Sequence, residues 1–170
     1  MKVKTSEIIE QAHLKKKEFE RVLILQDRAR MFFKTRNFFF DRGVLEVDCP
    51  ALISKASIDP YIDLIVANYG ESEERYLFSS PEYGMKRLLA MGIGDIYQLA
   101  HVYRDGECGL LHNPEFMMAE WYRLGITFEE MIDETQEFVH LFLENCPLQI
   151  ITYREVMKNF VGIDYVKASL

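Results

Sequence analysis

Residues 97–123 of the chain read YQLAHVYRDGECGLLHNPEFMMAEWYR, a sequence typical of two apolar-rich strands joined by a polar loop. Arg104 ends the first strand and His112 closes the loop. Successive strand residues point to opposite faces, so one face of the second strand should carry these alternate residues: Phe116, Met118, Glu120 and Tyr122. This face would carry an aromatic ring, a carboxylate and a phenol beside an arginine. Residues that only fill a hydrophobic core would not include so many polar groups. The hairpin is therefore a candidate site for a ligand with one anionic end and one cationic end.

The composition fits one folded domain. The 170 residues are 49% hydrophobic and 13% aromatic, which is enough to bury a sizeable core. The net charge of −7 argues against indiscriminate binding to nucleic acid, which depends on neutralising phosphates. Cys49, Cys108 and Cys146 lie far apart, match no metal-ligand spacing and indicate a reducing compartment. With no apolar run of the ~20 residues that span a membrane, and a charged N-terminus unlike a signal peptide, we expect a cytoplasmic protein without membrane contact.

The periodicity along the rest of the chain predicts helices packed on an antiparallel sheet, an α+β fold. A first helix should cover residues 5–41 and bury one apolar face, made of Val22, Leu25, Ala29, Phe32, Phe33 and Phe39. Further strands are expected at residues 44–47, 62–66 and 76–78, with a polar turn at 68–74.

Three further helices are predicted from their start signals. Ser80 with Pro81 and Glu82 gives a serine cap, a proline in the first turn and an acid at the positive end of the helix dipole. Thr127 and Thr152 each begin a capping-box pattern. The helix after Thr127 should run to about residue 145.

Arg104 can hold a phosphate or a carboxylate with two parallel hydrogen bonds, which a lysine cannot do as well. Taken alone, it could equally form a surface ion pair with Asp105 or Glu107. Glu82 could likewise be an ordinary first-turn acid, and Phe116 a plain core residue.

Glu120 lies in the apolar run MMAEWYR, where a carboxylate is costly unless it is paired. Beside Tyr122, it suits the ammonium group of a ligand. The alternative is a structural ion pair with Arg123 or Arg87. No acid or histidine cluster has metal-ligand spacing and no glycine-rich phosphate loop is present, so side chains would have to hold any nucleotide.

Together these segments resemble the catalytic domain of class II aminoacyl-tRNA synthetases of the lysyl type, over roughly residues 20–145. Residues 36–50, RNFFFDRGVLEVDCP, end a stretch from about residue 21 that resembles the family's first motif, a long helix and strand at a dimer interface. Residues 80–88, SPEYGMKRL, resemble the segment whose glutamate contacts the substrate α-amino group. Residues 97–123 resemble the second motif. The resemblance implies an antiparallel sheet flanked by helices.

The resemblance also implies a role for each candidate residue. ATP would be bound by Arg104, Glu107, His112, Asn113 and Phe116, and the substrate lysine by Glu82, Glu120 and Tyr122. Arg104 would be the catalytic residue, because it stabilises charge that develops when the substrate carboxylate attacks the α-phosphorus. Phe116 would stack on the adenine. Gly106 stands where the family has an adenine-facing glutamate, which leaves open whether Glu107 replaces it.

The wording of the motifs resembles most closely the small paralogues of the PoxA/GenX/EpmA type, which lack an anticodon-binding domain. These ligases attach lysine, preferably β-lysine, to a lysine of elongation factor P. The resemblance thus implies elongation factor P as a partner, a homodimer and no tRNA substrate. Two alternatives stay open: a fragment of a lysyl-tRNA synthetase, and a non-catalytic dimerisation or regulatory module.

The family's third motif, a glycine-rich strand and helix with an ATP-binding arginine, has no counterpart in the sequence. We therefore expect residues 1–170 to be the N-terminal portion of such a catalytic domain and to be inactive alone. The ligands of the Mg²⁺ that accompanies ATP are expected outside this chain.

Overall fold

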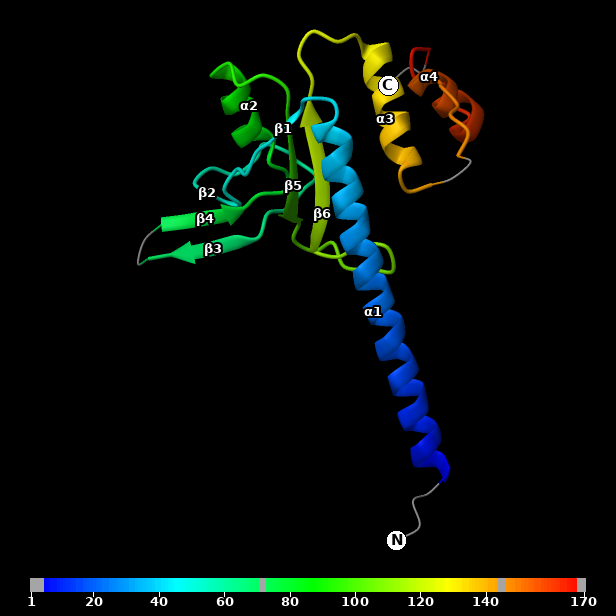
Figure 1. Ribbon diagram of the computed structural model, residues 1–170. Coiled ribbons are helices and arrows are strands. Elements are labelled where there is room, and N and C mark those ends of the chain that lie inside the picture. Colours follow the sequence, from blue (N-terminus) through cyan, green and yellow to red (C-terminus); the bar gives the residue numbers. More distant parts are fainter. Residues whose placement is uncertain (1–4, 71–72, 144–145, 168–170) are drawn as a thin grey trace.

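The computed structural model describes residues 5–70, 73–143 and 146–167, which form two small sheets with helices around them (Figure 1). The first sheet has the order β1–β5–β6, with bounds Leu45–Glu46, Ile96–Tyr103 and Glu115–Tyr122. The second has the order β2–β4–β3, with bounds Leu52–Ile53, Glu73–Leu77 and Val66–Tyr69. The helices are α1 Thr5–Phe40, α2 Glu82–Ala90, α3 Phe128–His140 and α4 Tyr153–Val156, which continues as a π-helical turn at Met157–Val161.

The predicted α+β class is confirmed, with one correction to the sheet. β1 pairs with β5 in parallel, whereas β5 pairs with β6, and β4 with β2 and β3, in antiparallel fashion. The first sheet is therefore mixed rather than antiparallel. A parallel pair needs a long crossover between its strands, and here the second sheet and α2 provide it.

The β5–β6 hairpin forms as predicted, and its register fixes which side chains share a face. Gln98 lies opposite Glu120, Ala100 opposite Met118, and Val102 opposite Phe116. The intervening residues, including Tyr97 and Trp121, point to the other face. The two faces are covered by different elements, and we call them the packed face and the cleft face.

The packed face carries an aromatic cluster made by three elements. α1 supplies Phe38 and Phe39, the hairpin supplies Tyr97 and Trp121, and α3 supplies Phe138. Phe39 is fully buried and its ring stacks on that of Tyr97, with 4.2 Å between the ring centroids. Burying such aromatic surface is the main stabilisation that holds α1 and α3 against the sheet.

Helix α1 has the predicted length, but its predicted buried face is wrong for most of that length. Val22, Leu25 and Phe33 are exposed, by 48%, 63% and 65%, and only the last two turns reach the core. The helix runs out from the body of the molecule, so its earlier turns have no element of the described chain beside them (Figure 1). The apolar pattern therefore predicts the helix correctly but does not identify what packs against it.

Two other element boundaries differ from expectation. Residues 62–65 lie outside the strands, and the predicted polar turn at 68–74 contains strand residues, with Asn68 paired to Glu74 and Tyr69 to Glu73. These polar residues form strands because the solvent-exposed side of an antiparallel sheet accepts polar side chains. Helix α3 ends at His140, and residues 144–145 lie outside the described chain. The capping boxes at Thr127 and Thr152 are confirmed.

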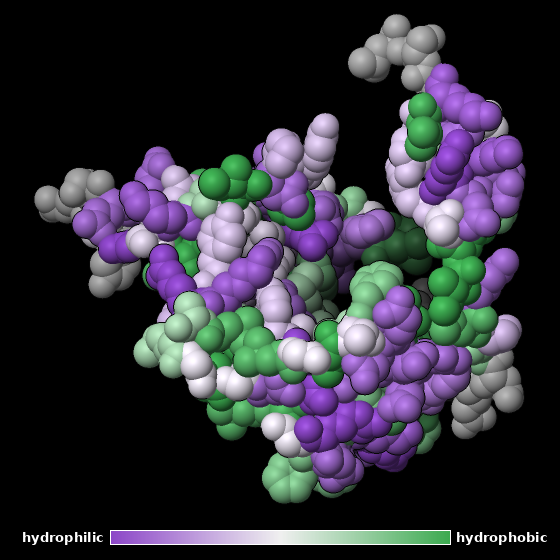
Figure 2. Space-filling view, turned by 90° about the horizontal axis from the view of Figure 1, so that it is seen from above, coloured by the Kyte–Doolittle hydropathy of each residue, from purple (hydrophilic) through white to green (hydrophobic). Residues whose placement is uncertain are grey.

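Seen from above, the surface is mostly polar, with apolar residues emerging in separate patches (Figure 2). Across the described residues, none of the helices is both long enough and apolar enough to cross a bilayer.

Candidate functional site

A cleft of about 550 Å³ opens on the cleft-face side of the hairpin. Four parts of the chain line it: residues 49–62 after β1, residues in and just after β4, the segment 80–87 that starts α2, and Arg104 just after β5. The lining residues include Cys49, Ser80, Glu82, Gly84 and Arg104. The cleft thus collects side chains from the segments that the sequence singled out.

Arg104 follows the last residue of β5, and its backbone N–H donates to the carbonyl oxygen of Pro114 at 2.9 Å, which closes the hairpin. Its guanidinium lies over the ring of Phe116, 5.1 Å from the centroid. One nitrogen lies 3.8 Å from a carboxylate oxygen of Glu107, so the alternative of a local ion pair is partly realised. However, Nε is buried and has no hydrogen-bond partner within the described chain. Arg104 therefore keeps unused donor capacity at the cleft.

Glu120 lies on β6 with its carboxylate bonded to two hydroxyl groups. Tyr122 donates its O–H to Oε1 at 2.8 Å, and Ser80 donates its O–H to Oε2. The alternative of an ion pair with Arg123 or Arg87 is wrong, since none is formed in the part of the chain that the structure describes. Both donors are neutral, so neither compensates a carboxylate as the cation of an ion pair would.

Tyr122 shares the environment of Glu120. Burial raises the pKa of its phenol, and the hydrogen bond and the negative charge of Glu120 raise it further. Tyr122 is therefore a donor to Glu120 that stays protonated at neutral pH. The pair presents one negative charge and one apolar ring face, a combination suited to an ammonium group.

The start of α2 places Glu82 at the cleft. Pro81 is the N-cap residue, and the hydroxyl of Ser80 accepts a hydrogen bond from the backbone N–H of Glu82 at 3.1 Å. The predicted serine N-cap is therefore wrong by one position, because Pro81 occupies the N-cap and Ser80 bonds the first helical N–H from outside the helix. Glu82 forms an ion pair with Lys86 one turn later, so a ligand ammonium at Glu82 would compete with Lys86.

Ser80 is the residue that the sequence reasoning missed. Its hydroxyl both accepts from the start of α2 and donates to Glu120, so it links the helix to the strand. The Ser-Ser-Pro-Glu pattern indicated the cap, but nothing in the sequence indicated a partner forty positions away on β6.

The β5–β6 loop carries the remaining candidates. His112 and Asn113 are exposed, and the only described contact of His112 is its carbonyl oxygen, which accepts from the backbone N–H of Gly109 at 3.0 Å. Glu107 is part-buried beside Arg104. Phe116 packs against the cluster of Phe78, Ala100 and Val102 while its ring meets Arg104. The structure therefore brings Arg104, Glu107 and Phe116 together, and leaves His112 and Asn113 on the loop surface.

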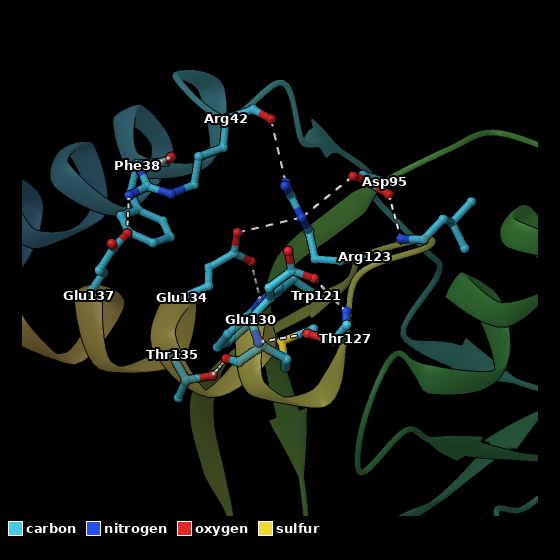
Figure 3. Close-up of polar contacts among 12 residues, drawn as sticks. Phe38, Arg42, Asp95, Trp121, Arg123, Thr127, Glu130, Glu134, Thr135 and Glu137 are labelled. Carbon is cyan, nitrogen blue, oxygen red and sulfur yellow. Dashed lines mark hydrogen bonds and ion pairs between the residues drawn. The ribbon is translucent and has the colours of Figure 1, made fainter. Parts of the chain in front are cut away.

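Arg123 does not reach Glu120, because its side chain points to the packed face (Figure 3). Its Nε is buried without a hydrogen bond but lies 3.5 Å from carboxylate oxygens of both Asp95 and Glu134. Its terminal nitrogen Nη1 donates to the carbonyl oxygen of Arg42 at 3.4 Å. Glu134 also accepts from the indole N–H of Trp121 at 3.0 Å. Arg123 thus has a structural role, joining the hairpin to α3 and to the turn that follows α1.

A metal site does not form from the described residues, because they contain no group of three or more His, Cys, Asp or Glu side chains that could hold an ion. The site in this chain therefore consists of an arginine at one end, a carboxylate with a phenol at the other, and a cleft beside them.

Comparison with known proteins places these residues in a family. Residues 5–169 match the family described as tRNA synthetases class II (D, K and N). An elongation factor P–(R)-β-lysine ligase of Pasteurella multocida (strain Pm70) is 38% identical over 146 residues, 83% of this chain and 45% of that protein. Ligases of the same name from Vibrio vulnificus (strain YJ016) and Pseudoalteromonas translucida (strain TAC 125) are each 36% identical, over 86% and 88% of this chain and 47% and 48% of theirs. The chain spans about half the length of these curated relatives.

Proposed function

The chain belongs to the class II tRNA synthetase family (D, K and N), and on that premise we propose that it carries the ATP- and lysine-facing part of a ligase that modifies elongation factor P. The ligase would activate lysine, or β-lysine, as an adenylate and transfer the aminoacyl group to a lysine side chain of elongation factor P. The names of the relatives from three genera support this substrate and this partner.

One observation carries the proposal: unused anion-binding and cation-binding groups lie along the same face of one hairpin. Arg104 has a buried Nε without a hydrogen-bond partner, and Glu120 is held by two hydroxyls and forms no close ion pair within the described chain. Arg104 comes six positions after Gln98, the cross-strand partner of Glu120, so about 20 Å of strand separates the two Cα atoms. The two side chains thus leave room between them for a ligand that has opposite charges at its two ends.

The proposed chemistry follows from these positions. The substrate ammonium binds Glu120 and Tyr122, and its carboxylate lies toward Arg104. A carboxylate oxygen then attacks the α-phosphorus of ATP and pyrophosphate leaves, while Arg104 stabilises the charge on the phosphate. The acceptor amine next attacks the acyl carbon, AMP leaves, and the amine loses a proton as the amide forms.

The other candidates complete the proposed ATP site. Phe116 stacks on the adenine, and His112, Asn113 and Glu107 line the phosphates and the base once the exposed loop closes over ATP. Glu82 receives the second amino group of the substrate in place of Lys86. The third motif and the residues that hold Mg²⁺ belong, in this proposal, to sequence outside residues 1–170, so residues 1–170 alone do not form the adenylate.

The test is ATP–pyrophosphate exchange that depends on lysine or β-lysine, measured in the protein as its gene encodes it. Arg104→Ala should reduce exchange by about 100-fold to 1,000-fold, because it removes a charged donor from the transition state. Arg154→Ala is the matched control, since Arg154 pairs with Asp164 in the α4 region and does not line the cleft. Full exchange in Arg104→Ala would contradict the role proposed for Arg104.

A lysyl-tRNA synthetase is the second candidate, because the matched family is described by tRNA synthetases. The two functions share the activation step and differ in the acceptor. Transfer of lysine to elongation factor P but not to tRNA-Lys supports the ligase, and the reverse supports the synthetase. Absence of exchange in the gene-encoded protein would instead favour a non-catalytic dimerisation or regulatory module.

The exposed apolar residues of α1 support a homodimer as part of the same proposal. Val22, Leu23, Ile24 and Leu25 are 47–65% exposed on a helix that projects from the body. Large apolar surface of this kind marks an interaction site more often than a solvated one. Sedimentation of the gene-encoded protein should give a dimer, and a monomer at micromolar concentration would contradict it.

A further inference from the structure

Gln98 is a buried amide that none of the roles above uses. Its side chain is only 2% exposed, and it lies directly opposite Glu120 on the cleft face of the hairpin. A buried amide is costly unless its polar atoms are bonded, so its partners indicate why it is there.

Both polar atoms of the Gln98 amide bind the backbone of one residue, Cys49. Its Oε1 accepts from the Cys49 N–H at 3.0 Å, and its Nε2 donates to the Cys49 carbonyl oxygen at 3.3 Å. Two residues earlier, Val47 still pairs with β5 through the main chain, donating to the Tyr97 carbonyl oxygen at 2.8 Å. The side chain of Gln98 therefore replaces strand pairing at the point where the chain leaves the sheet to become the wall of the cleft.

Cys49 in turn sets how closely α2 approaches the sheet. It lines the cleft, is buried, and packs with Met85 of α2 and Ile96 of β5. A Cβ on Gly84 would lie 2.7 Å from the Cβ of Cys49 and 2.8 Å from its Sγ, closer than atoms can pack. The first turn of α2, which carries Glu82, is thus in direct contact with the residue that Gln98 holds.

We infer that Gln98 is a positioning residue that sets the separation between Glu82 on α2 and Glu120 on β6, and thereby the length of the diamino acid that the site accepts. The inference rests on the proposed function, in which the two carboxylates receive the two amino groups of the substrate. The path runs from the strand that carries Glu120, through the Gln98 amide and Cys49, to Gly84 beside Glu82. Small errors in such spacing weaken binding of an extended ligand at both of its ends.

The test compares lysine with ornithine, which is one methylene shorter, in ATP–pyrophosphate exchange by the gene-encoded protein. Gln98→Met keeps the length of the side chain but removes both hydrogen bonds. It should lower the ratio of kcat/KM for lysine to kcat/KM for ornithine by about 10-fold or more, mainly through KM, because one methylene in a fitted site is worth about that much.

The matched control is Thr35→Val. Thr35 is another buried polar residue, 3% exposed, but its hydroxyl bonds only within α1, to the Met31 carbonyl oxygen at 2.9 Å. Both variants should lose stability, and only Gln98→Met should change the lysine-to-ornithine ratio. An unchanged ratio in Gln98→Met would overturn the inference, whereas absence of lysine-dependent exchange in the unmutated protein would overturn the proposed function itself.

If Gln98→Met does not fold, a second pair of variants tests the same contact between α2 and Cys49. Gly84→Ala should push α2 away from Cys49 and lower the same ratio. Adding Cys49→Gly removes the two atoms that the new Cβ would meet, and should restore the ratio toward its original value. A ratio that stays constant through both variants would overturn the inference.

Discussion

The packed face and the cleft face of the β5–β6 hairpin are built from the same two strands, yet they differ in what they leave unsatisfied. On the packed face, aromatic rings from α1, α3 and the hairpin fill the space, and the one indole N–H there finds a carboxylate. Each face also has one arginine whose buried Nε makes no hydrogen bond, Arg123 on the packed face and Arg104 on the cleft face. Carboxylates of Asp95 and Glu134 lie 3.5 Å from the Nε of Arg123. On the cleft face, Arg104 pairs only with Glu107 among the described residues, at 3.8 Å, and Glu120 is bonded to two neutral hydroxyls. The charged groups of the packed face are therefore compensated by one another, whereas those of the cleft face are less fully compensated within the described chain.

The largest expected effect concerns stability on the packed face. Phe39→Ala should lower the free energy of unfolding by about 3–5 kcal/mol, because Phe39 is fully buried among aromatic rings. Phe33→Ala, on the same helix but 65% exposed, should change it by about 0.5 kcal/mol or less. Urea denaturation of both variants checks the difference. Equal losses would show that α1 is buried further along its length than the isolated chain indicates.

A smaller effect separates two neighbouring residues that point to opposite faces. Trp121→Phe removes the indole N–H that bonds Glu134, and Tyr122→Phe removes the hydroxyl that bonds Glu120. Each should lower the free energy of unfolding by about 1–3 kcal/mol, because each deprives a carboxylate of a donor.

Function should distinguish these two variants where stability does not. In the gene-encoded protein, Tyr122→Phe should raise the KM for lysine in ATP–pyrophosphate exchange, while Trp121→Phe should leave it unchanged. A raised KM for lysine in Trp121→Phe would contradict the assignment of one face of the hairpin to structure and the other to function.

The smallest expected effect is on the pH dependence of stability, and it applies to both faces. Burial raises the pKa of Tyr97 on the packed face and of Tyr122 on the cleft face, and a hydrogen-bonded carboxylate, Glu46 or Glu120, raises each further. A pKa raised in the folded state contributes stability that is complete below the ordinary value of about 10 and is lost as the pH rises above it.

Tyr97→Phe and Tyr122→Phe should therefore each make the alkaline loss of stability less steep. Thermal unfolding followed above pH ~10 checks this, since the ordinary phenol ionises there. The same slope in both variants and in the unmutated protein would mean that neither phenol is held protonated by the fold.

Much of the hairpin could be predicted because its signals are local. The alternation of residues 115–122, the Gly and Pro residues of the loop and the capping box at Thr127 each act within a few positions, and each was confirmed. The strand near residue 66 was misplaced because exposed strands carry no clear alternation, so polarity suggested a turn where backbone pairing formed a sheet.

The sequence by itself determined the α+β class of the fold, the two strands of the hairpin, and the alignment of Phe116, Glu120 and Tyr122, because side-chain direction in a strand alternates with position. Only the tertiary structure decided that Arg123 turns to Asp95 and Glu134, that Ser80 reaches Glu120, and that Gln98 holds Cys49. Those contacts join residues that lie between 11 and 49 positions apart in the sequence. No local rule encodes them, since they depend on how the elements pack.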